Sequence, residues 1–304
     1  MKRKPSLIAL ALLILFTFLT AFQLSPAVHA GQAGMVDMAG REIMLTVPAK
    51  RLVALQPADC EILFAIGAGE TLVGRGAYAA YPEEVLAVPS VQSGFETNLE
   101  QIIALKPDAV IMPTMNQREE DAKKLEEAGI AVIISDAQTI EQAYAVIGLL
   151  GRVTGYEENA RKIASGMQAS FAALKDKVGD RRGGSIYFEV SPLEYGLWAA
   201  GSGTFMDEIG QLLNLTNAFS DIQGWKSISE EQVIARSPDI IVTTSMYAGS
   251  GPTPVEEMMS RPNWGSVKAI SEKKVFQAAA DAITQPGPRL VEAAEALFQF
   301  VYGD

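Results

Sequence analysis

The side chains that could carry chemistry in this sequence are aromatic rings and carboxylates, because histidine and cysteine are almost absent. The 304 residues include one histidine, His29, and one cysteine, Cys60. His29 lies in a segment that we expect to be removed, which leaves no Ser/His/Asp or Cys/His triad and no His-ligated metal site. Cys60 stands at the start of an amphipathic helix, where a small buried packing residue is expected. We therefore predict a protein that performs no covalent chemistry and carries no cofactor.

Aromatic residues follow predicted strands in both halves of the chain. Ligands of open α/β folds bind at the carboxyl ends of the strands. Rings at these ends would suit a large, flat, partly apolar ligand, since rings supply contact area at low entropic cost. Any one of these rings could instead pack over a domain edge. The predicted cleft residues are Tyr78, Tyr81 and Phe95 of the first half, and Tyr195, Trp198, Trp225 and Asp281 of the second half.

A helix–turn–strand pattern occurs twice, at residues 98–112 and 229–243. In each copy a polar N-cap residue precedes two helical turns, a proline stops the helix, and a short apolar run follows. Because the apolar run does not alternate, it predicts a buried parallel strand. The positions identical in one ungapped register are Glu100/Glu231, Gln101/Gln232, Ile103/Ile234, Ala104/Ala235, Pro107/Pro238 and Asp108/Asp239.

The repeated glutamate calls for more than a local explanation. A carboxylate in a first helical turn stabilises the helix dipole by about 0.3–1 kcal/mol, which accounts for one such residue. It does not require the same residue in the same register of both halves. We predict that Glu100 and Glu231 are exposed, one on each lobe, and dock on two arginine-lined pockets of a two-fold symmetric partner.

The first 30 residues have the pattern of a cleavable signal peptide. Three basic residues at positions 2–4 precede an apolar run over residues 7–19, and small residues end at Ala30. The run is short for a membrane span, and a retained anchor is the alternative. Removing this segment changes the formal net charge from -11 to -14, and an acidic surface disfavours nucleic acid as a partner. With no cysteine near the cleavage site, we expect a soluble periplasmic monomer without a lipid anchor.

Strands and helices alternate along the rest of the chain, which predicts a parallel sheet in each half. A long helix over residues 157–178 lies near the middle and is interpreted as a rigid connector; an ordinary helix covering a sheet is the alternative. The fold class is therefore α/β, with two Rossmann-like lobes joined by one connector helix. The expected division is a signal peptide at residues 1–30, an N-terminal lobe at 31–155, the connector at 156–180 and a C-terminal lobe at 181–304.

These motifs resemble the class III periplasmic substrate-binding proteins of ABC importers, which bind cobalamin, ferric siderophores or haem. The resemblance covers about residues 51–300. It implies two lobes that close slightly on a metal chelate, and a permease dimer whose arginines receive Glu100 and Glu231. The residues that carry it are Arg51-Leu52-Val53-Ala54-Leu55, Asn98-Leu99-Glu100 with Ala104-Leu105-Lys106-Pro107-Asp108, and Ser229-Glu230-Glu231-Gln232-Val233 with Ala235-Arg236-Ser237-Pro238-Asp239.

Within that family the chain looks most like the cobalamin-binding members. The similar parts are the loop at residues 77–82, Trp225 shortly before the second glutamate, and Asp281 with Pro288-Arg289 beyond it. The chain departs from them at Phe95, where those proteins tend to have tryptophan, and in the tryptophan-free loop at residues 113–115.

The resemblance leaves other ligands and roles open. A ferric siderophore or haem is the alternative ligand, with Tyr78 or Tyr195 available to haem iron and Arg75 or Lys226 to a siderophore. A chelatase-like enzyme on a related fold and a sensor that presents its ligand to a membrane protein are less favoured roles.

Overall fold

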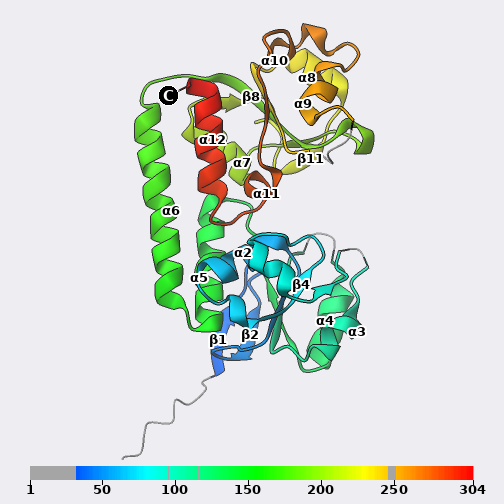
Figure 1. Cartoon of the computed structure of the whole chain (residues 1–304), viewed down its shortest axis with the longest axis vertical. Helices are drawn as coiled ribbons and strands as arrows, with labels where there is room; N and C mark the ends of the chain where they lie inside the picture. Colours follow the sequence, from blue (N-terminus) through cyan, green and yellow to red (C-terminus); the bar gives the residue numbers. More distant parts are fainter. Residues whose placement is uncertain (1–31, 95, 115–116, 246–250, 304) are drawn as a thin grey trace, which may run out of the picture. The chain divides into compact units, whose positions relative to one another are not determined.

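The computed structural model describes residues 32–94, 96–114, 117–245 and 251–303. The predicted signal peptide lies outside these ranges. Residues Gln32–Asp304 form one compact unit. Within this unit two sheets are built from the first and second halves of the chain, and the long helix α6 (Glu157–Val178) connects them (Figure 1).

The first half begins with an antiparallel hairpin and continues into a parallel sheet. The hairpin pairs β1 (Gln32–Val36) with β2 (Glu42–Thr46). The parallel sheet has the strand order β5-β4-β3-β6-β7, so the chain crosses over at each strand pair as in doubly wound folds. Its strands are β3 (Leu52–Ala54), β4 (Leu72–Gly76), β5 (Ser90–Val91), β6 (Ala109–Met112) and β7 (Ala131–Ile134).

This sheet is covered on both faces, which explains why its strands are apolar at successive positions. Leu52 and Ala54 of β3 pack into one buried cluster with residues of α2 and α5, whereas Val53 packs into another with residues of α3 and α4. The four helices are α2 (Pro57–Ala65), α3 (Leu99–Ala104), α4 (Glu119–Glu127) and α5 (Ile140–Thr154).

The second half contains a mixed sheet with the order β11-β9-β8-β12-β13, and β10 also pairs with β8. The pairs of β8 with β10 and β12, and of β12 with β13, are parallel. β9 and β11 run antiparallel to their neighbours, a feature that the sequence analysis did not predict. The connection from β8 to β9 is too short for a crossover, so β9 must return antiparallel. The strands are β8 (Gly184–Ser191), β9 (Trp198–Ala200), β10 (Leu215–Asn217), β11 (Trp225–Ser227), β12 (Ile240–Thr243) and β13 (Val275–Gln277).

Helices cover this second sheet as well. Ile186 and Phe188 of β8 lie in one buried cluster with residues of α7 and α12, and Tyr187 lies in another with residues of α8, α9 and α10. The helices are α7 (Phe205–Leu212), α8 (Glu230–Arg236), α9 (Pro254–Met259), α10 (Lys268–Ser271), α11 (Ala280–Ile283) and α12 (Leu290–Tyr302). The α/β fold class predicted from the sequence is confirmed, with the second sheet mixed rather than wholly parallel.

The repeated stretch has the same structure in both halves. Asn98 caps α3 and Ser229 caps α8 through hydrogen bonds to the backbone N–H three residues on. The repeated aspartate then ties each unit to the neighbouring strand: Asp108 Oδ2 accepts from Arg51 N at 2.9 Å, and Asp239 Oδ2 accepts from Ser185 N at 2.7 Å. These bonds explain the aspartate in structural terms.

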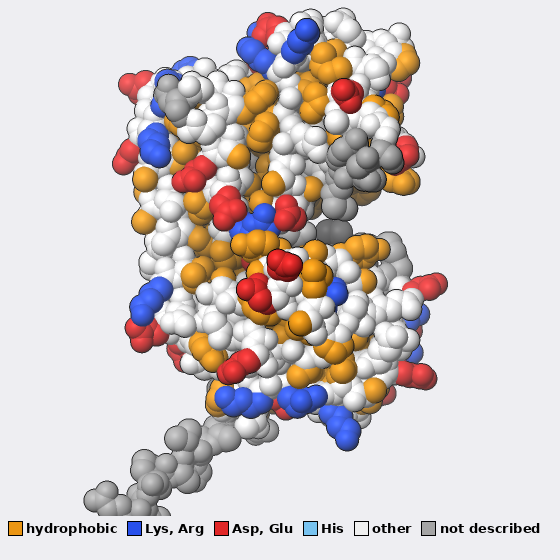
Figure 2. All heavy atoms as spheres, in the orientation of Figure 1, with side chains coloured by type: hydrophobic (Ala, Val, Ile, Leu, Met, Phe, Trp, Pro, Cys, Tyr) orange, Lys and Arg blue, Asp and Glu red, His pale blue; other side chains and the backbone are white. Residues whose placement is uncertain are grey.

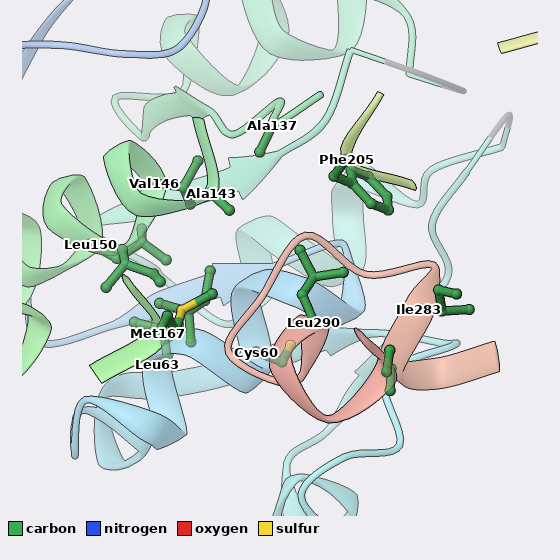
Figure 3. Close-up of a cluster of buried hydrophobic side chains, with 14 of the residues drawn as sticks. Cys60, Leu63, Ala137, Ala143, Val146, Leu150, Met167, Phe205, Ile283 and Leu290 are labelled. Atoms are coloured by element: carbon green, nitrogen blue, oxygen red, sulfur yellow. The ribbon is translucent and has the colours of Figure 1, made fainter. Parts of the chain in front are cut away.

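The two halves share a hydrophobic core. They also meet at a set of hydrogen bonds that join Gln138 and Ile140 to the second half, called the polar seam below. Figure 3 shows this shared core, with Cys60 and Leu63 of α2 and with Phe205, Ile283 and Leu290 of the second half.

Gln138 lies at the polar seam. Its backbone oxygen accepts from Phe205 N at 2.7 Å, and its side-chain Oε1 accepts from Trp225 Nε1 at 2.7 Å. Ile140 N donates to Glu208 Oε2 at 2.6 Å. The halves are therefore joined by packing, by hydrogen bonds and by α6.

Candidate functional site

A cavity of about 870 Å³ lies between the two halves and is called the crevice below. Figure 2 shows a hollow between the two halves on this face of the molecule. Its walls include Tyr78 and Tyr81 of the first half, and Tyr195, Asp281 and Glu257 of the second half. Four of the predicted cleft residues therefore meet at one cavity.

The two tyrosines of the first half lie in the loop after β4, which is held against the sheet. A Cβ at Gly76 would come within 2.2 Å of the Leu55 carbonyl oxygen, so only glycine fits where this loop begins. The Arg75 guanidinium donates to the Ala79 carbonyl at 3.0 Å and to Val88 O at 3.2 Å. These hydrogen bonds shape the loop. They give Arg75, named above as a candidate siderophore ligand, a structural role.

Tyr78 and Tyr195 present their rings to solvent. Tyr78 is 80% exposed and Tyr195 is 77% exposed, the most exposed aromatic side chains of the described chain. Tyr195 ends the short 3₁₀ turn Leu193–Tyr195, and its hydrogen bond to Glu194 raises the pKa of its hydroxyl. Large rings that are left uncovered at a cavity are candidates for covering by a ligand.

Arg289 joins the two halves beside the crevice. Its guanidinium carbon stands 3.9 Å from the ring centroid of Tyr81, and its Nη1 lies 2.7 Å from Asp281 Oδ2. Its backbone N–H donates to Glu61 Oε1 of α2 at 3.0 Å. Burial raises the pKa of Glu61 to about 7, and the bond from Arg289 opposes that rise. Asp281 lies in the first turn of α11.

A buried ion pair lies behind Glu257, which lines the crevice. Arg261 is 5% exposed and donates to both oxygens of Glu189, at 2.7 and 2.9 Å. It also donates to Glu257 at 2.7 Å and stacks on Trp264 at 4.6 Å. Burial raises the pKa of Glu189, and the bidentate bonds from Arg261 oppose that rise. This pairing holds Glu257 in position at the crevice wall.

Three predicted cleft residues are not among those that line the crevice. Trp225 is half-buried, packs on Phe205 with ring centroids 5.3 Å apart and bonds to Gln138 across the seam. Trp198 of β9 is 41% exposed, and its carbonyl accepts from Tyr187 Oη at 3.4 Å. Phe95 lies outside the described residues.

Three charged residues at the crevice were not predicted from the sequence, where the aromatic rings gave the stronger signal. These are Glu61, Glu194 and Glu257. Glu61 lies four positions after Pro57, and both line the crevice; this helical spacing on one face was a readable signal.

The two repeated glutamates are exposed, Glu100 in α3 and Glu231 in α8. A hydrogen bond from Ser229 lowers the pKa of Glu231, which keeps this carboxyl charged. Asn98 and Leu99 line a shallow hollow next to Glu100.

Three further observations concern a second hollow, metal-binding clusters and membrane-spanning helices among the described residues. A second hollow of about 730 Å³ runs along β2 and β7 and contains none of the predicted cleft residues. Residues 32–303, apart from the gaps given above, include no cluster of three or more histidine, cysteine, aspartate or glutamate side chains arranged to hold a metal ion. The helices in the same ranges include none with the length and apolar character needed to cross a bilayer.

Comparisons with known proteins agree with this architecture. The chain is 31% identical over 274 residues to the uncharacterized ABC transporter substrate-binding lipoprotein YvrC of Bacillus subtilis, covering 88% of this chain and 85% of that protein. It is 30% identical over 263 residues to the vitamin B12-binding protein of Salmonella typhimurium, covering 84% of this chain and 93% of the relative.

A solved structure, the periplasmic heme binding protein HutB of Vibrio cholerae, superposes with a TM-score of 0.74 at 21% identity, over 83% of this chain and 98% of that one. This last likeness shows the fold. The model of the periplasmic binding protein family matches residues 52–282. With that match over most of its length, the chain belongs to the periplasmic binding protein family.

Proposed function

We propose that this protein is the substrate-binding component of an ABC importer and captures a metal chelate, with a corrinoid as the preferred ligand. The observation that carries the proposal is the crevice, where exposed tyrosines from both halves face one cavity of about 870 Å³. Cavities of this size accommodate large organic ligands. The similarity to a vitamin B12-binding protein over 84% of the chain favours the corrinoid.

Haem or a ferric siderophore is the second candidate ligand. The exposed hydroxyl-bearing rings of Tyr78 and Tyr195 favour it, because a tyrosine oxygen can ligate haem iron. Calorimetry and absorbance titration with cobinamide, cobalamin, haemin and ferric siderophores separate these ligands. We expect the corrinoids to bind more tightly than the other chelates, and preference for haemin would replace the first candidate by the second.

We further propose that the protein acts outside the cytoplasmic membrane after removal of residues 1–30. The relative from Bacillus subtilis is a lipoprotein, and this raises the question of an anchor. The only cysteine of the present chain, Cys60, is fully buried in α2. A mass equal to that of residues 31–304 without added lipid is expected for the exported protein, and a lipid-sized increment would refute it.

Glu100 and Glu231 are proposed to hold the loaded receptor on the permease dimer. Both lie at the N-terminal turn of a repeated helix and neither lines the crevice. Replacing both with alanine is expected to abolish uptake while ligand affinity stays nearly unchanged. Glu158→Ala, an exposed carboxylate of α6, is the matched control. An equal loss of binding and uptake in the double variant would show that these residues serve the ligand site instead.

A further inference from the structure

Among the residues that the structure describes, every charged side chain that lines the crevice is a carboxylate. They are Glu61, Glu194, Glu257 and Asp281. The positions left out of the description between residues 32 and 304 contain no lysine or arginine, so they add no positive charge. This site is the crevice itself, established by its volume and its exposed rings. Burial raises the pKa of Glu61 to about 7, so Glu194, Glu257 and Asp281 set the electrostatic character of the crevice at neutral pH.

Two arginines that pair with residues of the crevice wall, Arg261 and Arg289, do not reverse this character. Arg261 lies behind the wall with its side chain 2% exposed, and it is shared between Glu189 and Glu257. Arg289 has a side chain 13% exposed and is shared between Asp281 and Glu292. Each guanidinium therefore faces two carboxylates, and the crevice keeps an excess of negative charge.

Acidic walls discriminate between chelates that are similar in size and shape. A carboxylate of the ligand that approached Glu194 or Asp281 would meet like charge in a partly desolvated space, where repulsion is stronger than in water. An amide at the same position would instead donate its N–H to the carboxylate, which is a charge-assisted hydrogen bond. Arg289 already pairs with Asp281 of the crevice wall and stacks on Tyr81.

We infer that the crevice selects chelates with neutral, amide-bearing edges and rejects chelates whose edges carry carboxylates. This inference rests on the proposed function, because it takes the bound ligand to be a metal chelate. Among chelates, corrinoids with intact side-chain amides satisfy it, whereas haem with two propionates and siderophores with free carboxylates do not.

The test compares ligands that differ only in these groups. Calorimetry measures the affinity of residues 31–304 for cobinamide and for the corrinoid whose side-chain amides are hydrolysed to carboxylates. We expect the carboxylate form to bind at least about tenfold more weakly, and the gap to shrink with added salt, which screens charge. The same comparison with haemin and its dimethyl ester should favour the ester.

Variants locate the effect. The double variant Glu194→Gln/Asp281→Asn should reduce the difference in affinity between the two members of each ligand pair. Glu158→Gln on α6 should leave this difference unchanged. Equal affinity within each ligand pair overturns the inference and leaves the proposed function standing. Tighter binding of the carboxylate member also overturns it. Binding of neither member of either pair overturns the inference and removes corrinoids and haem from the proposed function, which then keeps only a ferric siderophore as the ligand.

Discussion

The buried carboxyl of Asp59 is expected to make the protein less stable as the pH rises. Asp59 lies in the first turn of α2 with its side chain fully buried. Its Oδ1 accepts a hydrogen bond of 2.5 Å from Ser135 Oγ, and its Oδ2 has no hydrogen-bond partner within the described part of the chain. Burial raises the pKa of Asp59 to about 7, although the hydrogen bond from Ser135 opposes the rise.

The size of the effect follows from the difference in pKa between the folded and unfolded states. The ordinary pKa is 3.8, so ionising Asp59 in the folded protein costs about 4 kcal/mol at high pH. Below about pH 4 both states are protonated and the full stability is present. As the pH rises towards the folded pKa, the folded state holds the extra proton, so the free energy of unfolding falls. Between pH 5 and pH 8 this residue should lower it by about 2.5 kcal/mol.

Urea unfolding of residues 31–304 at intervals from pH 5 to pH 8 measures this loss when the parent is compared with Asp59→Asn. The variant cannot titrate at this position, so its stability relative to the parent should improve by about 2.5 kcal/mol over that range. The control is Glu119→Gln, an exposed carboxyl that lies 2.9 Å from Lys123, which lowers its pKa. Its difference from the parent should stay constant above pH 5. Parallel curves for the parent and Asp59→Asn would refute the reasoning.

Four further substitutions at three places test the packing that shapes the site. Arg261→Met leaves the buried charge of Glu189 without its partner and should lower the free energy of unfolding by about 3–5 kcal/mol, measured by urea denaturation. Adding Glu189→Leu should recover part of this loss of stability. Gly76→Ala forces a Cβ against the Leu55 carbonyl and should cost about 1–3 kcal/mol, with a matching fall in melting temperature. Trp225→Phe removes an indole hydrogen bond between the two halves and should cost about 1 kcal/mol of stability. A larger loss in ligand affinity, about 1–3 kcal/mol by calorimetry, would support the predicted place of Trp225 in the binding site.

Features set by local signals were predictable from the sequence. The repeated N-cap and proline pattern correctly predicted α3 and α8 with the strands that follow them, because capping and helix termination depend on residues close in sequence. The helix predicted over residues 157–178 is α6, whose amphipathic pattern extends over its whole length.

Features that depend on tertiary contacts were not predictable in the same way. The strand β9 is three residues long and lies in an aromatic-rich segment, so its pattern carries no period that would identify an antiparallel pair. The position of Trp225 at the seam depends on Gln138, which is 87 positions away in the sequence. The acidic walls of the crevice arise only when Glu61 of one half meets Asp281 of the other.

The hydrogen bonds of the repeated aspartates separate the surface that carries Glu100 and Glu231 from the proposed ligand site. Asp108 and Asp239 each anchor the helix that carries an outward glutamate to the start of an adjacent strand, whereas Tyr78 and Tyr195 lie in segments beyond the opposite ends of strands. Substitutions in those tyrosine-bearing segments therefore leave the positions of Glu100 and Glu231 unchanged, because the sheets hold the two helices that carry them. Under the proposed docking role of Glu100 and Glu231, receptors that diverge in their ligands keep a common docking surface for a single transporter.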